Sequence, residues 1–232
     1  MGAKLVGRWQ SGAPTMRAAS QDNRALAADD CANNDFEFAT DITPVPATAA
    51  NQCDDTFGDV PADPAGDICP WAAHIRKSYP RDDSGPPPSS YQSQPTSPAF
   101  DESDTQTHRL LRRGIPYGTS STSTLESPNE DGTDRGLLFL AYMTSIVDQF
   151  EFVTKNWVNT ADFKAAGAGI DPILGQSNGA DGSRQRTFRV RSDGADHDLQ
   201  TDTDWVIPTG GGYFFAPSID AIQHHLASTP AT

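Results

Sequence analysis

The apolar positions of this chain are gathered in a few short runs, and long polar stretches separate them. The longest run, residues 135–143 (RGLLFLAYM), is apolar on both faces, which predicts a central strand of a sheet. Between residues 146 and 157 the apolar side chains recur at intervals of four, three and four residues. This spacing predicts an amphipathic helix, which Thr144 or Ser145 would cap.

Shorter patterns predict the remaining elements. Residues 68–77 (ICPWAAHIRK) predict a helix that Asp67 would cap, and residues 108–118 predict a short strand that ends in a Gly/Pro turn. Residues 212–216 predict a last strand, and residues 219–226 predict a last helix. Strands and helices in this order, separated by long loops, predict an α+β fold.

The composition favours one domain with much of its length in loops. The chain has 232 residues, of which 19 are Gly and 18 are Pro, and we interpret residues 1–232 as a single domain. Residues 78–107 are rich in Pro and Ser, which predicts a solvated loop or insertion. We expect residues 158–204 to be mostly loop as well.

Charge and hydropathy exclude two classes of function. The net charge is −14 at pH 7, and so acidic a surface repels nucleic acid phosphates and anionic lipids. We therefore expect no nucleic-acid partner. The apolar runs are too short to cross a membrane, so we expect no membrane-spanning segment either.

Three cysteines, Cys31, Cys53 and Cys69, limit the chain to a single internal disulfide bond. If a bond forms, the pairing that we expect joins Cys31 to Cys53. Three unpaired thiols are the alternative. The close spacing that is typical of a zinc site is missing from all pairs of these cysteines.

Four polar residues are candidates for chemistry, and each also has an ordinary structural explanation. His74 either ligates a metal or haem iron or bonds a carbonyl, and Arg76 nearby is suited to binding a carboxylate. Arg112 either lies at a solvated strand edge or presents a fixed positive charge to a peroxide or carboxylate. Asp171 is either a turn residue or the acceptor of a ligating imidazole's second N–H.

Seven short blocks, taken in chain order, resemble successive parts of fungal-type dye-decolorizing (DyP-type) haem peroxidases. The two most specific blocks are CPWAAHIRKSYPR (69–81) and HRLLRRGIPYG (108–118). The others are GAKLVGRWQSGAP (2–14), NNDFEF (33–38), DRGLLFLAYMTSI (134–146), DPILGQ (171–176) and GGYFFAPSI (211–219). The resemblance covers nearly the whole chain. It corresponds to the carboxy-terminal half of such an enzyme, so we expect the amino-terminal half to be absent.

The resemblance implies a fold, a cofactor and a set of residue roles. The fold would be ferredoxin-like, an antiparallel sheet with helices that forms one half of a dimeric α+β barrel. The cofactor would be haem b, with His74 ligating the iron and Asp171 behind the imidazole. Arg112 would face peroxide on the opposite side. Leu137 and Phe139 would line that pocket.

The implied activity is the oxidation of dyes or phenolic compounds with hydrogen peroxide. Tyr117 and Trp157 match positions that can pass electrons from small aromatic reductants, whereas core packing is the simpler interpretation of each residue by itself. Arg76, beside the expected iron ligand, would contribute to cofactor binding. Fungal members of the family are often secreted, so the resemblance also implies an extracellular protein.

One motif departs from the family's pattern. The amino-terminal half of these enzymes carries Gly-x-x-Asp-Gly, whose Asp helps to cleave peroxide, and this chain contains no such motif. We therefore expect peroxidase activity to be reduced or absent in this chain alone. Two alternatives are a haem-binding module without catalysis and a structural remnant that binds nothing. An open sheet edge would also favour a homo-oligomer or aggregation.

Overall fold

The computed structural model describes residues 1–36, 38, 57, 62–83, 102–124, 127–176, 185–192, 194–201 and 204–226. The helices are α1 (Gly2–Val6), α2 (Arg24–Ala28), η1 (Ala32–Asn34), α3 (His74–Ser78), α4 (Glu102–Thr107), η3 (Ile146–Glu151), η4 (Val153–Val158), α5 (Ile219–Ala221) and η5 (Ile222–Leu226). The strands are β1 (Leu111–Arg112), β2 (Ile115–Tyr117), β3 (Gly136–Leu138), β4 (Ala141–Tyr142), β5 (Arg186–Ser192) and β6 (Ala195–Thr201). Turns and extended segments make up most of the other described residues.

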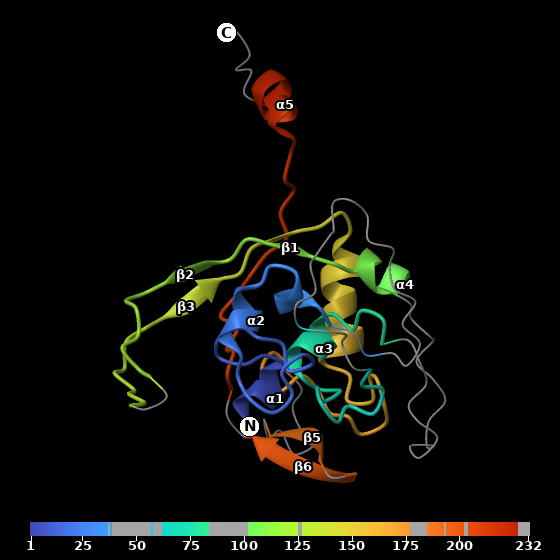
Figure 1. Ribbon diagram of the computed structural model, residues 1–232. Coiled ribbons are helices and arrows are strands. Elements are labelled where there is room, and N and C mark those ends of the chain that lie inside the picture. The colour runs from blue at the N-terminus through green and yellow to red at the C-terminus, as the bar shows by residue number, and fades with distance from the viewer. Residues whose placement is uncertain are drawn as a thin grey trace, which may run out of the picture.

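Four of these strands form one antiparallel ribbon, which projects away from the helices (Figure 1). β1 pairs with β4 and β2 pairs with β3, and both pairings follow a single register in which Leu111 faces Tyr142 and Tyr117 faces Gly136. β5 and β6 form a separate hairpin. Antiparallel strands, short helices and long loops confirm the predicted α+β class.

Helix α3 lies at the centre of the packed part of the chain, where it contacts α1 and η4 (Figure 1). The surrounding clusters bury Met16, Phe36, Phe38, Cys69, Ala72, Ala73, Val153, Trp157, Val158, Phe163, Phe188 and Val190. Each large apolar side chain that is fully buried stabilises the fold by about 1.5–3 kcal/mol. The core therefore fixes α3 from several sides, and α3 carries the candidate ligand His74 at its first position.

The helix expected over residues 68–77 begins later than predicted. α3 starts at His74 with Ala73 as its N-cap, so Asp67 is not the cap. Residues 67–69 form a turn instead, because their three backbone N–H groups donate to the carboxylate of Asp63. Such local bonds from side chain to backbone compete with helix formation.

The prediction of a central strand over residues 135–143 was wrong. The run is divided between β3 and β4, and each pairs with one neighbour only. Leu137 and Leu138 are 58% and 61% exposed. A two-stranded ribbon has no third strand or packed layer to cover its faces, so apolar side chains on it stay in solvent.

One prediction near the carboxy terminus was also wrong, and another was incomplete. Residues 212–216 are extended but make no strand pairing among the described residues. Most of the described residues between 158 and 204 lie outside helices and strands, as expected, but the range also includes the β5–β6 hairpin, which turns at Gly194 with a φ of 75°. The helix expected over residues 219–226 is present as α5 and η5.

The remaining predictions met mixed outcomes. Ser145 caps the helix that follows it by accepting from Asp148 N, as expected. Within the Pro/Ser-rich segment 78–107, residues 84–101 lie outside the described ranges, and α4 occupies the end of the segment. Cys31 is disulfide-bonded and Cys69 is a buried free thiol. The expected partner of Cys31, Cys53, also lies outside the described residues.

In the described part of the chain, the helices are too short and too polar to span a bilayer.

Most of the exposed large apolar side chains of the described residues lie in two regions. The first is the β1–β4 and β2–β3 ribbon, and the second is the segment 205–226, which runs away from the core to α5 (Figure 1). Phe214 and Phe215 are each 88% exposed. Contiguous apolar surface of this kind is typical of regions that contact something else or that aggregate.

We expect Phe214→Ser with Phe215→Ser to leave the free energy of unfolding within about 0.5 kcal/mol of the unmodified chain, because neither ring is packed. Self-association, measured by sedimentation velocity, should fall. Phe188→Ala is the matched control, since that ring is 1% exposed and its loss should cost about 3–5 kcal/mol. A double variant as destabilised as the control would show that the tail rings are buried in solution.

Candidate functional site

The candidate site is built on a contact between His74 and Asp171, which are far apart in the sequence. Nδ1 of His74 lies 2.8 Å from Oδ2 of Asp171. The imidazole is 25% exposed, whereas the carboxylate is fully buried. The predicted pairing of these two side chains is therefore confirmed as a contact, and one edge of the imidazole stays open to solvent.

Asp171 is held so that its orientation is fixed. Its second oxygen, Oδ1, accepts from the backbone N–H groups of Ile173 and Leu174 at 2.8 and 2.9 Å. Its own backbone N–H donates to the carbonyl of Val158 at 2.9 Å. These bonds explain the DPIL sequence locally, because an Asp before Pro accepts from the amides that follow and closes a tight turn.

This arrangement determines which nitrogen of His74 can act as a ligand. A carboxylate in its ionised form only accepts hydrogen bonds, so this contact favours the tautomer of a neutral imidazole with the hydrogen on Nδ1 and the lone pair on Nε2. A carboxylate behind a ligating imidazole fixes its tautomer and its ring orientation and increases its basicity. His74 can therefore present Nε2 to a metal or to a haem iron.

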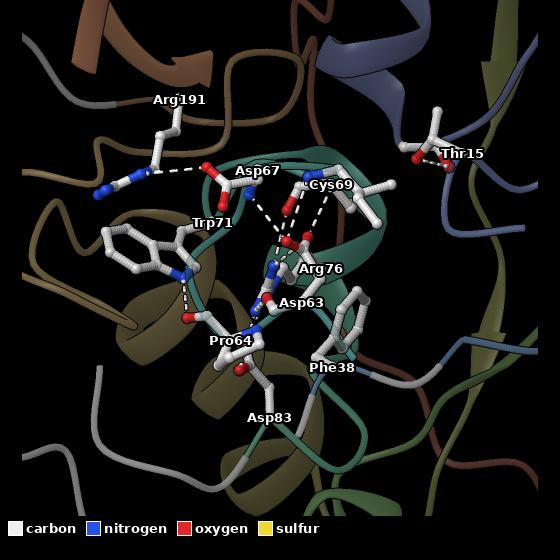
Figure 2. A network of polar contacts seen from close by, with 12 residues as sticks. Thr15, Phe38, Asp63, Pro64, Asp67, Cys69, Trp71, Arg76, Asp83 and Arg191 are labelled. Atoms are coloured by element: carbon white, nitrogen blue, oxygen red, sulfur yellow. Dashed lines mark hydrogen bonds and ion pairs between the residues drawn. The ribbon is translucent and has the colours of Figure 1, made fainter. Parts of the chain in front are cut away.

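The helix that carries His74 is anchored by Arg76, two residues further on (Figure 2). All five N–H donors of the buried guanidinium are used. Two go to the Asp83 carboxylate at 2.7 and 3.0 Å, and one goes to the Asp63 carboxylate at 3.2 Å. The other two reach the backbone carbonyls of Cys69 and Asp63 at 2.6 and 2.9 Å. The Phe38 ring lies 4.2 Å from the guanidinium carbon and covers it.

The charges in this network shift the pKa of each member. Burial alone would lower the pKa of Arg76, but Asp83 and Asp63 outweigh it and raise the pKa above its ordinary value. Burial raises the pKa of Asp63 despite Arg76. Burial would also raise the pKa of Asp83, but Arg76 and Lys164 lower it. The Arg76–Asp83 ion pair is therefore fully charged near neutral pH.

The setting of Arg76 differs from the predicted one. We expected this residue to help bind a cofactor, but its five donors are engaged inside the protein. No N–H group is left for an external carboxylate. Sequence reasoning did not find Asp63 or Asp83, because single Asp residues in polar segments carry no pattern that distinguishes a buried partner from a turn residue.

Four other predicted site residues, three for the peroxide pocket and the surface relay Tyr117, lie on the ribbon. Arg112 is on β1, Tyr117 on β2 and Leu137 on β3, and Phe139 follows β3. All four are exposed. Within the described residues, no hydrogen bond or ion pair connects any of them to His74. The structure thus brings His74 and Asp171 into contact. The residues expected on the peroxide side, Arg112, Leu137 and Phe139, lie on a separate element, the ribbon.

Trp157 is packed in the core, which is the simpler of its two interpretations. It is 1% exposed and stacks on Phe163, with ring centroids 5.8 Å apart. Phe152 and His108 meet the indole edge-on at 5.3 and 5.2 Å. Tyr117, in contrast, is 52% exposed on the ribbon.

Comparison with known proteins identifies the family. A family profile described as "Dyp-type peroxidase, C-terminal" matches residues 92–166. Peroxidase 2 of Mycetinis scorodonius is 36% identical over 98% of this chain, and the dye-decolorizing peroxidase of Auricularia auricula-judae is 32% identical over 98%. The chain belongs to the DyP-type peroxidase family. It spans 40% of the length of each of these two relatives.

Solved DyP structures share the fold of this chain. A crystal structure of the decolorizing peroxidase from Auricularia auricula-judae superposes with a TM-score of 0.65 at 30% identity, covering 98% of this chain and 45% of that one. An ancestral D-type dye-decolorizing peroxidase gives a TM-score of 0.66 at 33% identity. The predicted ferredoxin-like α+β class is therefore confirmed.

We expect Arg76→Met in this DyP-type chain to lower the free energy of unfolding by about 3–5 kcal/mol, because Asp63 then stays buried without its cation and Asp83 keeps only Lys164. Arg76→Lys should be intermediate, since an ammonium keeps the charge but cannot make five bonds. Urea unfolding followed by circular dichroism measures both. Arg135→Met removes an exposed ion pair with Asp131 and serves as the control that leaves the transition in place. A midpoint for Arg76→Met equal to that of the control would contradict the anchoring role.

Proposed function

We propose that this chain is the haem-binding part of a peroxidase that oxidises dyes or phenolic compounds with hydrogen peroxide. The observation that carries the proposal is the His74–Asp171 contact in a chain of the DyP-type family. A structural histidine can be fully buried, whereas an axial ligand needs one ring nitrogen that is accessible to the cofactor. The partly exposed imidazole of His74, with a buried carboxylate behind it, therefore fits an axial ligand better.

The donor set fits haem. His74 would ligate the iron through Nε2, and a neutral imidazole nitrogen is a common axial ligand of haem proteins. A solved relative, 29% identical with a TM-score of 0.65, is described with an engineered heme pocket. When bound, haem supplies the reduction of peroxide and the one-electron oxidation of a reductant. We propose haem b, the form that is not attached covalently.

Four residues besides His74 have a part in the proposed chemistry. Asp171 would keep the hydrogen of the imidazole on Nδ1 and so would leave the Nε2 lone pair available to a haem iron. The guanidinium of Arg112 would bind peroxide and would stabilise the negative charge that develops on it. Leu137 and Phe139, which are exposed on the ribbon, would exclude water from that side once the ribbon is covered.

Electrons come from small aromatic reductants. Tyr117 is the relay that we propose at the surface, because its ring is half exposed on the ribbon. Trp157 is buried, so it would act as an internal step that receives electrons through the rings that it contacts. Both residues pass an electron without binding the haem.

Proton transfer is the weakest part of the chemistry in this chain. A positioned acid–base group contributes about 10²–10⁴-fold to a rate. The chain has no Gly-x-x-Asp-Gly motif. We therefore propose that turnover by this 232-residue chain alone is lower than in its relatives, with water moving the peroxide proton.

We also propose an extracellular location. Cys31 is disulfide-bonded, and disulfide bonds persist in oxidising compartments and are rare in the cytosol. Export can be checked directly by assaying the culture medium of the source cells with an antibody against the chain.

An absorption spectrum of the purified chain after haem addition, followed at once by peroxide, tests the proposal. A Soret band that shifts with peroxide supports a peroxidase. A band that does not respond supports the alternative, a haem-binding module without catalysis. The absence of a band would overturn haem binding altogether.

We expect His74→Ala to lose the Soret band, because Nε2 of this residue is the proposed axial ligand. Addition of free imidazole should restore part of the band if the cavity left by the side chain is intact. His224→Ala is the matched control, since that histidine is exposed near the carboxy terminus and its imidazole bonds to Asp220. A haem spectrum that survives in His74→Ala would show that another residue holds the iron.

We expect Arg112→Leu to keep the Soret band but to react with peroxide about 10²–10³-fold more slowly, which is the effect of removing one preorganised donor from a developing anion. Stopped-flow absorbance measures this rate. Arg113→Leu provides the control on the same ribbon, because Arg113 donates to the backbone of Arg112 and has no proposed contact with peroxide. Equal peroxide rates in the two variants would contradict the assignment of Arg112.

A further inference from the structure

Lys77 is fully buried, yet the proposed chemistry makes no use of it. It lies three residues after His74 on α3, so the two side chains share one face of the helix. Its ammonium donates to the carbonyl of Thr160 at 2.7 Å and to the carbonyl of Phe163. The Phe163 ring covers the ammonium, with the centroid 5.3 Å from Nζ. A buried lysine is costly unless its donors are used, so these contacts need an explanation.

Both carbonyls belong to the segment that delivers Asp171. This segment, residues 158–171, follows η4 and is closed on itself by two backbone bonds. Asp171 N donates to Val158 O at 2.9 Å, and Gly169 N donates to Ala161 O at 2.8 Å. Helix α3 therefore contacts one loop at two points. Lys77 donates to carbonyls near the start of the loop, and the imidazole of His74 contacts Asp171 at its end.

Charge attraction between Lys77 and this segment adds to the hydrogen bonds. Asp171 and Asp162, both on this segment, are the acidic groups that act on the Lys77 ammonium. Burial lowers the pKa of Lys77 to about 7, and the two carboxylates oppose that shift. Below that pH the lysine is a cation beside a buried carboxylate whose only ion pair among the described residues is with His74.

We propose that Lys77 is a positioning residue for the His74–Asp171 pair, because it fastens the loop that carries the carboxylate to the helix that carries the imidazole. Without this clamp the loop moves, Asp171 no longer takes the Nδ1 hydrogen and the direction of Nε2 is lost. Removal of a residue that hydrogen-bonds to a metal ligand typically lowers metal affinity by about 10–100-fold. The importance of Lys77 for catalysis rests on the proposed function, whereas its effect on the pair does not.

The first test uses the haem-free chain. Proton–nitrogen correlation spectra of the histidine rings at pH 6 should show the His74 Nδ1 proton protected from exchange by its bond to Asp171. We expect Lys77→Met, which keeps the length of the side chain without its charge or donors, to lose that protection. Lys77→Arg has donors for both carbonyls and should restore it. Arg17→Met removes another buried cation, one that pairs with Asp35, and should leave the Nδ1 signal unchanged.

A double-mutant cycle measures the coupling between the clamp and the carboxylate. Urea midpoints are determined for Lys77→Met, Asp171→Asn and the double variant. Because each change removes part of one arrangement, the shift of the double variant should be smaller than the sum of the two single shifts. Additive shifts together with a protected Nδ1 proton in Lys77→Met would overturn the proposal. If Lys77→Met does not fold, Lys77→Gln replaces it in both measurements.

Haem titration then separates this inference from the proposed function. A loss of Nδ1 protection in Lys77→Met, with no haem binding by the unmodified chain, would support the clamp and sink the haem assignment. Haem binding by the unmodified chain, with Nδ1 protection retained in Lys77→Met, would support the haem assignment and overturn the clamp. If both hold, haem affinity should fall about 10–100-fold in Lys77→Met.

Discussion

The structure depends on burying two cations of one short helix against the backbone and the carboxylates around it. α3 has only five residues, and a helix of that length is not stable in water by itself. Arg76 uses every donor that it has, and Lys77 reaches two carbonyls of another loop. Since an unpaired buried charge costs several kcal/mol, these side chains allow the helix only one position relative to its surroundings.

The rigidity of α3 determines the geometry of the candidate ligand. His74 begins the helix, so its imidazole is placed by the same contacts that hold Arg76 and Lys77. Asp171 comes to it from a loop that is closed by its own backbone bonds and is contacted by Lys77. The site therefore needs no long helix or large sheet, because buried polar contacts at neighbouring positions of one turn do the positioning.

The sequence could predict the parts of this arrangement that have a local or a family pattern. The alternation of short elements predicted the α+β class, the 146–157 spacing predicted a helix, and the family blocks paired His74 with Asp171. The partners Asp63 and Asp83 could not be found, because a buried carboxylate in a polar segment looks like any other turn residue. The apolar run over residues 135–143 was misread because hydrophobicity does not reveal whether a strand has a neighbour on each side. The β5–β6 hairpin was missed although the buried residues Arg186, Phe188 and Val190 alternate with exposed or half-buried residues along β5.

The two sides of the proposed site differ in what holds them in place. On the side of His74, every polar partner comes from packed, described residues, and the core covers α3. On the side of Arg112, the residues lie on a ribbon whose apolar side chains are in solvent. The position of His74 depends on buried contacts, whereas the position of Arg112 depends on what packs against the ribbon. The iron-ligand side of the site can therefore be in place while the peroxide side is not. A chain built in this way can separate haem binding from peroxide turnover. For this reason, loss of the first should follow changes at α3, and loss of the second should follow changes at the ribbon.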